Sequence, residues 1–288
     1  MKTQILHEEW KPIEGKIAVF IMSFSGDSEC LIQCLRGIDE QKKRGYNLEV
    51  FVIDDANNPL ELTEEQLANV HYKKSYFPRN GNLNGTQCAQ GMLMEMLRCC
   101  RECKAQYVMK VDSDMYIRTL ERFLKPLEED PNKVIGFKLS KDMCYCAGVT
   151  YILPVTGLYK AIKDFYDWFK SEKANQDKYI QYCPEDWAIT RCVTSVNNYT
   201  MCQWDNSTNP ENWLLAPFNY REIEADGTIN PLCFARFTMY DFVNFGNRYE
   251  LDQECKCESL LAKKSQRQIA AQFMKSFIDF DLNNTFTN

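Results

Sequence analysis

The sequence predicts an α/β fold in which helices flank a mostly parallel central sheet. Three observations predict it: continuous apolar runs, amphipathic segments that alternate with those runs, and polar residues directly after several runs. A continuous apolar run is typical of a strand that is buried on both faces. Strand–helix alternation favours a parallel sheet with right-handed crossovers. With 288 residues, 45% of them hydrophobic, the chain can bury such a core.

The first half of the chain carries the clearest alternation. Residues 17–24 (IAVFIMSF) are an apolar run, and apolar residues at helical spacing follow from Cys30 until Gly45 ends the helix. A second run at 48–53 stops at Asp54-Asp55. The remaining elements expected in this half are a short helix before residue 70, a strand at 70–76, a loop at 79–85, a helix at 86–103 and a strand at 107–111.

The second half is less regular. We expect strands at 134–137 and 149–153, helices at 156–169, from Cys183 onward and at 258–280, and loops over 197–235. Without a linker or repeat, the chain is predicted to be a single domain. It divides into a regular half at about 15–118, a less regular half at about 119–250 and a C-terminal helix within 251–288.

Composition excludes several function classes. A net charge of -6 argues against nucleic acid as a partner. Two histidines exclude a His-Glu-x-x-His zinc site and weigh against a Ser-His-Asp hydrolase. The 14 cysteines are predicted to be buried, reduced thiols, and with no signal-like or membrane-spanning segment this favours a cytoplasmic location.

Basic residues in the last predicted helix leave peripheral contact with anionic lipid open as an alternative to a solvated helix face. They are Lys263, Lys264, Arg267 and Lys275.

Asp112 and Asp114 follow the apolar run at 107–111. If the strand continues through them, side chains two residues apart share a face, and both carboxylates point the same way. Paired carboxylates bind a hard divalent cation such as Mg²⁺ or Mn²⁺, which can bridge diphosphate oxygens. The ends of parallel strands are also where α/β sheets bind ligands, and Ser23 and Asp54-Asp55 end two other predicted strands.

Glu185-Asp186 opens a predicted helix, directly after Pro184. A carboxylate here either caps the helix or serves as a general base that removes a proton from an acceptor hydroxyl. Of the two, Asp186 is the preferred candidate for the base.

These motifs together resemble the nucleotide-binding half of the GT-A glycosyltransferases. The resemblance rests on the run at 17–24, on Asp54-Asp55, on the Asn/Gly loop with its helix, and on residues 110–114 (KVDSD). Residues 145–151 (YCAGVTY) resemble the Cys-x-Gly-x-x-Tyr segment of β-1,3-galactosyl and N-acetylglucosaminyl transferases, and Pro184-Glu185-Asp186 resembles their Glu-Asp motif. The resemblance extends over about residues 15–195 and also includes family-2-like bacterial glycosyltransferases.

The resemblance implies a GT-A-like, Rossmann-like fold and a metal-dependent, inverting glycosyltransferase. The half at about 15–118 would bind the nucleotide sugar, and the half at about 119–250 would bind the acceptor. The expected donor is a UDP-sugar, the acceptor a hydroxyl of a glycan or lipid-linked sugar, and the cofactor Mn²⁺ or Mg²⁺ on Asp112 and Asp114. The implied site residues are Ser23, Asp54, Asp55, Gly81, Lys110, Asp112 and Ser113 for the nucleotide sugar, Gly148, Tyr151 and Trp187 for the acceptor, and Asp186 with Glu185 for catalysis.

One departure concerns the metal. Many members of this fold supply a late histidine as a ligand, whereas no histidine follows His71 here. Arg236, Asp241 or Arg248 are candidates for contact with metal or phosphate in its place.

Two alternative functions stay open at this stage. The missing histidine suggests a non-catalytic protein that binds a nucleotide sugar or glycan. Asp112 and Asp114 would also suit a phosphohydrolase in which Asp112 is the nucleophile and Asp114 the acid/base.

Overall fold

The computed structural model describes residues 11–79, 83, 85–138, 146–171, 183–197, 201–204, 215–217, 241–245 and 266–284. A seven-stranded sheet in the order β3-β2-β1-β4-β7-β6-β8 lies at its centre. The strands are β1 (Ile13–Ser23), β2 (Leu48–Asp54), β3 (His71–Lys74), β4 (Ala105–Val111), β6 (Val134–Lys138), β7 (Cys146–Pro154) and β8 (Met201–Trp204).

The sheet is mostly parallel. β1 pairs in parallel with β2 and β4, and β2 pairs in parallel with β3. β7 is the exception, because it runs antiparallel to both β4 and β6. The predicted α/β architecture is confirmed, and the antiparallel β7 brings the second half of the chain beside the end of β4.

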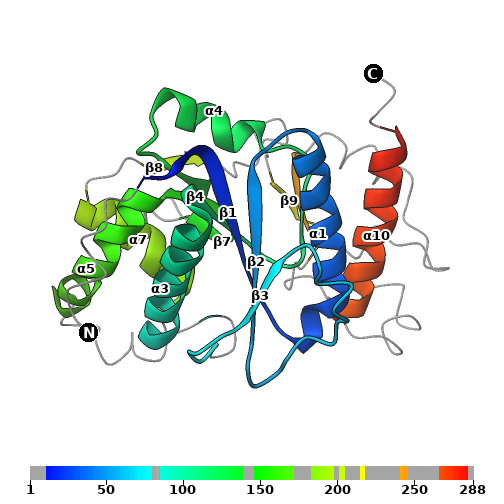
Figure 1. The fold of residues 1–288 in the computed structure, drawn as a ribbon, viewed down its shortest axis with the longest axis horizontal. Coiled ribbons are helices and arrows are strands. Elements are labelled where there is room, and N and C mark those ends of the chain that lie inside the picture. Colours follow the sequence, from blue (N-terminus) through cyan, green and yellow to red (C-terminus); the bar gives the residue numbers. More distant parts are fainter. Residues whose placement is uncertain are drawn as a thin grey trace.

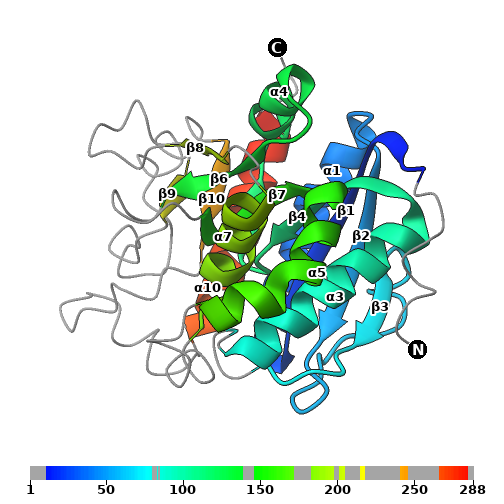
Figure 2. The ribbon, with the colours of Figure 1, turned by 90° about the vertical axis from the view of Figure 1, so that its left-hand side faces the viewer.

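Helices cover both faces of the sheet (Figures 1 and 2). On one face lie α1 (Ser28–Lys43) and α10 (Gln266–Asn284), side by side although they come from opposite ends of the described chain. The other face carries α3 (Thr86–Cys103), α5 (Val155–Ser171) and α7 (Glu185–Asn197). The result is a three-layer arrangement with the sheet in the middle.

The apolar run in β1 explains why both faces need helices. Successive side chains of a strand point to opposite sides, and β1 is apolar on both. Toward α1 and α10 it buries Ile17, Val19 and Ile21. Toward α3, α5 and α7 it buries Ala18, Phe20 and Met22.

A second, three-stranded sheet lies beside the first in the order β5-β10-β9. Its strands are β5 (Met115–Ile117), β9 (Leu215–Pro217) and β10 (Phe242–Asn244). The backbone N–H of Phe245, just after β10, donates to the carbonyl of Asp114 at 3.0 Å. This small sheet therefore supports the turn that carries Asp112 and Asp114.

Several elements differ from the sequence predictions. The short helix expected before residue 70 is a series of turns, and the expected loop at 197–235 contains β8 and β9. β5 and α4 (Glu121–Glu129) were not predicted, because β5 is only three residues long and Pro126 interrupts the helical pattern of α4. The first part of the last predicted helix, residues 258–265, lies outside the described residues.

Eight of the described cysteines are buried, free thiols, as expected. They are Cys30, Cys34, Cys88, Cys99, Cys100, Cys103, Cys146 and Cys183. Within the described part of the chain, every helix is too short or too polar to cross a membrane.

Candidate active site

The candidate site lies where β1, β2 and β4 end at the same edge of the sheet. Ser23 is in register with Asp54 across β1 and β2, and the ends of the strands are therefore level. Asp112 follows β4 directly, with its backbone N–H donating to the carbonyl of Val149 in β7 at 2.9 Å. The topology thus brings together the three polar strand ends that the sequence singles out.

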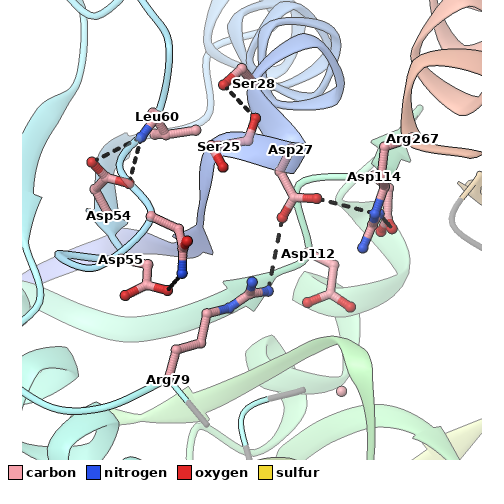
Figure 3. Close-up of polar contacts among 12 residues, drawn as sticks. Ser25, Asp27, Ser28, Asp54, Asp55, Leu60, Arg79, Asp112, Asp114 and Arg267 are labelled. Atoms are coloured by element: carbon pink, nitrogen blue, oxygen red, sulfur yellow. Dashed lines mark hydrogen bonds and ion pairs between the residues drawn. The ribbon is translucent and has the colours of Figure 1, made fainter. Parts of the chain in front are cut away.

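Asp112 and Asp114 lie in the turn between β4 and β5. The strand ends at Val111, where the sequence predicts, and residues 112–114 leave it, so the two aspartates are not part of β4. The two carboxylates have different partners: Asp112 Oδ1 contacts Lys110, whereas Asp114 Oδ2 contacts Arg267 (Figure 3). The Asp112 side chain is 34% exposed, whereas that of Asp114 is 7% exposed.

A third carboxylate, Asp27, completes a group that we call the carboxylate cluster (Asp27, Asp112 and Asp114). Asp27 ends a short 3-10 turn between β1 and α1, and its side chain is almost fully buried. The sequence reasoning missed it, because a lone aspartate after Ser25-Gly26 matches no motif. Its position beside the predicted pair follows only from the parallel pairing of β1 with β4.

Two arginines lie against the carboxylate cluster (Figure 3). The Nε of Arg267, in the first turn of α10, is 3.2 Å from Asp27 Oδ1, and its Nη1 pairs with Asp114 Oδ2. The Nη2 of Arg79 is 3.9 Å from Asp27 Oδ2, and its guanidinium lies 3.9 Å from the centre of the Phe24 ring. Two buried or half-buried guanidinium groups thus frame the site on the side of Asp27.

Burial makes ionisation of two of the carboxyls harder. It raises the pKa of Asp27 to about 6, with Asp114 adding to the shift and Arg267 opposing it. Burial likewise raises the pKa of Asp112 to about 6, with Lys110 opposing the shift and Asp114 adding to it. A cationic ligand at this cluster would relieve the repulsion between these neighbouring negative charges.

Lys110 connects the carboxylate cluster to Glu185. Its side chain is fully buried, and its Nζ contacts Asp112 Oδ1 and the Gly148 carbonyl and lies 3.2 Å from Glu185 Oε1. The Tyr151 hydroxyl donates to Glu185 Oε2 at 2.8 Å. Predicted as ligand-binding residues, Lys110 and Tyr151 are buried here and hold Glu185 and Asp112 in place.

Asp186 is the more accessible acid of the pair at the start of α7. Its Oδ2 accepts from the backbone N–H of Gly148 at 2.8 Å, and its Oδ1 accepts from that of Trp187 at 2.7 Å. A Cβ on Gly148 would lie 3.1 Å from Glu185 Oε1 and 3.2 Å from Asp186 Oδ2, which explains glycine at this position. Burial raises the pKa of Asp186.

Asp54 and Asp55 hold the loop after β2. The Asp54 carboxylate accepts from the backbone N–H of Leu60 at 3.0 and 3.1 Å and from the Tyr72 hydroxyl. Asp55 accepts from the backbone N–H of Asn57 and from the Asn58 side chain. Both line the edge of the site, but their oxygens are engaged within the loop.

Ser23 and Ser113 are buried next to these loops. The Ser23 hydroxyl has no hydrogen-bond partner among the described residues. Nucleotide contact by Ser23, Asp54, Asp55 and Ser113 stays a prediction.

Other predicted residues lie elsewhere or outside the described chain. Gly81, Arg236 and Arg248 are outside it, and Asp241, a candidate for metal or phosphate contact, pairs with Arg122. Of the basic residues in the last predicted helix, Lys263 and Lys264 lie outside the described residues. Arg267 points into the site, and Lys275 pairs with Asp279 at 2.8 Å.

The chain resembles known proteins in its fold and not in its sequence. No family model and no curated protein sequence matches the chain. Among solved structures, the apo form of the bifunctional glycosyltransferase WbbM matches with a TM-score of 0.50 and 12% identity, over 81% of this chain and 46% of that one. The chain has a GT-A-like fold. It spans less than half the length of WbbM, and the likeness concerns the fold alone.

Two further glycosyltransferase structures resemble this chain more weakly. The galactosyltransferase LgtC with donor and acceptor sugar analogues has a TM-score of 0.47 and 11% identity, over 88% of this chain and 95% of that one. A glycosyltransferase involved in glycosylation of the PBCV-1 major capsid has a TM-score of 0.43 and 13% identity, over 91% and 99% of the two chains.

Proposed function

We propose that the protein is a glycosyltransferase that binds the diphosphate of a nucleotide-sugar donor at the carboxylate cluster and uses Asp186 as its base. One observation carries the proposal. Asp112, at the strand-end edge where α/β sheets bind ligands, is joined through buried Lys110 to Glu185, the neighbour of Asp186. The proposed metal ligand Asp112 and the neighbour of the proposed base are thus held in one network of ion pairs around Lys110.

The residues of the cluster suit a divalent cation. Asp114 Oδ1 is buried and has no hydrogen-bond partner among the described residues. Carboxylates outnumber cationic side chains in this network. The carboxylates are Asp27, Asp112, Asp114, Glu185 and Asp186, and the cationic residues are Arg79, Lys110 and Arg267. A diphosphate would be repelled by this excess unless a cation accompanied it.

We propose Mn²⁺ or Mg²⁺ on Asp112 and Asp114. Among the described residues, no three carboxylate, histidine or cysteine side chains are placed so that they could hold one metal ion together. Oxygen atoms from solvent and diphosphate would therefore complete the coordination, as is usual for Mg²⁺. When bound, the cation would offset negative charge on the departing nucleotide.

Asp186 suits the role of base better than Glu185. Glu185 is buried and is held by both Lys110 and Tyr151, while Asp186 is partly exposed. In the proposed reaction, Asp186 takes the proton of an acceptor hydroxyl while that oxygen bonds to the anomeric carbon and the bond to the diphosphate oxygen breaks. One such displacement inverts the anomeric configuration.

The finer assignments are proposals as well. The donor is a UDP-sugar, and the acceptor is a hydroxyl of a glycan or lipid-linked sugar that lies near Gly148 and Trp187, beside Asp186. The free, buried cysteines support a cytoplasmic location, because reduced thiols persist there.

Thermal unfolding with UDP, with and without Mn²⁺, tests the proposal. Ligand at a hundredfold excess over its Kd stabilises the folded state by about 2.7 kcal/mol. For a chain of this size that raises Tm by roughly 5 °C or more. The rise should require Mn²⁺, vanish in Asp114→Asn and persist in Asp39→Asn, which changes an exposed aspartate on α1.

The outcomes separate the candidate functions. No rise in Tm with any nucleotide in the presence of Mn²⁺ would overturn the proposal. Binding of UDP-sugars without release of UDP, across a broad panel of acceptors, would identify a non-catalytic nucleotide-sugar-binding protein. Trapping of a phosphoryl group on Asp112 from an aryl phosphate would identify a phosphohydrolase.

A further inference from the structure

Arg267 reaches the carboxylate cluster from an element that the motifs do not include. It lies in the first turn of α10, and its side chain is 20% exposed. Its guanidinium contacts Asp27, in the turn after β1, and Asp114, in the turn after β4. One cation thus bridges two buried carboxylates from the turns after two neighbouring strands (Figure 3).

The contact with Asp114 uses one of its two carboxylate oxygens. Oδ2 accepts from Arg267 Nη1, while buried Oδ1 has no hydrogen-bond partner among the described residues. Asp114 is also a proposed ligand of the divalent cation. A cation that binds Asp114 meets the positive charge of Arg267 at once, so the two compete for the same carboxylate.

A guanidinium released from Asp114 would have a natural new partner. Its planar set of N–H donors fits phosphate oxygens, and such charge-assisted hydrogen bonds are among the strong ones. Arg79 lies on the other side of Asp27, and its Nε lacks a hydrogen-bond partner among the described residues. The site therefore holds two guanidinium groups around one buried aspartate, a suitable arrangement for an anion with two phosphates.

We propose that Arg267 is a diphosphate-binding residue that competes with the divalent cation for Asp114 until the donor arrives. Without donor, Arg267 neutralises Asp27 and Asp114. With cation and donor present, the cation takes Asp114 and Arg267 binds the diphosphate. The inference rests on the proposed function and adds to it a coupling, in which nucleotide and cation strengthen each other's binding.

Binding measurements on Arg267→Gln test this directly. Free Mn²⁺ is measured by electron paramagnetic resonance without nucleotide, and UDP binding is measured by calorimetry at saturating Mn²⁺. Loss of Arg267 removes the competitor, so we expect Mn²⁺ alone to bind at least about threefold more tightly. We expect UDP to bind about tenfold more weakly, the loss typical of a charge-assisted hydrogen bond.

Two further variants make the result specific. Arg36→Gln removes another contact between α1 and α10, the 2.5 Å ion pair with Asp279, about 18 Å along α10 from Arg267. Both binding constants should stay at the wild-type values in this control. Arg267→Lys keeps the charge but not the planar fork, so Mn²⁺ binding should stay near wild type while UDP binding weakens.

Opposite changes in Mn²⁺ and UDP binding in Arg267→Gln would support the inference. Unchanged constants, or a loss of both, would mean that Arg267 only supports the fold, and would overturn the inference while the proposed function stands. Failure of the wild-type protein to bind Mn²⁺ or UDP would overturn the proposed function itself. Thermal unfolding of each variant checks that the protein used for the binding measurements is folded. If Arg267→Gln does not fold, Arg267→Lys serves as the test.

Discussion

At the scale of single residues, Lys110 has the largest expected effect on stability. Its ammonium group is fully buried between Asp112 and Glu185 and also contacts the Gly148 carbonyl. Those neighbours raise the pKa of Lys110 and outweigh the opposing effect of burial. The lysine therefore stays charged, and its removal would leave buried carboxylates without a counter-ion.

We expect Lys110→Met to lower the free energy of unfolding by about 3–5 kcal/mol, the range for a broken buried ion pair. Adding Glu185→Gln should recover part of the loss, because it removes one of the uncompensated charges. Urea unfolding measures both variants. Lys42→Met, which changes a surface lysine beside Asp39, should cost less than about 1 kcal/mol. A loss that small for Lys110→Met would contradict the buried network.

The residues of the site divide by how they could be found. Asp112, Asp114 and Asp186 were predicted because each belongs to a short motif at a predicted strand end or helix start. Asp27 and Arg267 belong to no motif, and they join the site only through the packing of α10 on α1 and the pairing of β1 with β4. Sequence spacing carries no information about such contacts.

At the scale of elements, α10 is anchored by a buried carboxylate. Asp281 accepts from the Tyr116 hydroxyl at 2.7 Å and from Arg118 Nε at 2.9 Å, and so ties the helix to β5 and the residue after it. Two residues earlier on the same helix, Asp279 pairs with Arg36 and Lys275 at the surface. The two aspartates form a matched pair for mutation.

Asp281→Asn should lower the free energy of unfolding by about 3 kcal/mol, because it breaks the ion pair between two largely buried groups, Asp281 and Arg118. Asp279→Asn should lower it by less than about 1 kcal/mol, since that pair is exposed. Urea unfolding of the two variants side by side checks this order. Equal losses would mean that α10 is not held through Asp281.

Elements were predictable where a long periodic pattern determines them. The helix expected at 86–103 has those bounds in the structure, and the strand expected at 48–53 extends by one residue. β5 could not be found, because its three residues become a strand only by pairing with β10, far along the chain. The antiparallel direction of β7 likewise depends on a tertiary pairing with β4.

At the scale of the whole molecule, the apolar cores on the two faces of the sheet enclose the buried thiols. Cys30 and Cys34 lie in the core on the α1 side, and the other six lie in the core on the α3 side. Burial raises the pKa of Cys88 and of Cys183 to about 12, well above the usual value for a thiol. The thiolate is the reactive form. These thiols should therefore react slowly while the protein is folded.

Iodoacetamide labelling at pH 8, mapped by mass spectrometry, checks this. We expect the eight cysteines that are buried as free thiols to be protected in the folded protein and labelled in urea. Fast labelling of Cys34, packed on the α1 side of the sheet, or of Cys100, packed on the α3 side, would contradict the packing on that face.

The overall architecture was the most predictable level. Apolar runs and helical spacing determine the layers, and polar residues after the runs indicate the edge where the site lies. The irregular second half was less predictable, because its short strands obtain their order from pairing rather than from local pattern. The expected division into halves also assigns α10 to neither, although its Arg267 contacts both strand-end turns.

The bridge from Arg267 to Asp114 spans 153 positions of the chain, which sets an order of events on the ribosome. At typical synthesis rates, roughly 8 to 30 seconds separate the making of these two residues. During that interval β1, β2 and β4 can already pair, whereas Asp27 and Asp114 lack their guanidinium partner and α1 lacks its neighbour. A nascent chain would thus acquire its sheet before Arg267 completes the proposed donor site, and under that proposal nucleotide could assist folding only after α10 has emerged.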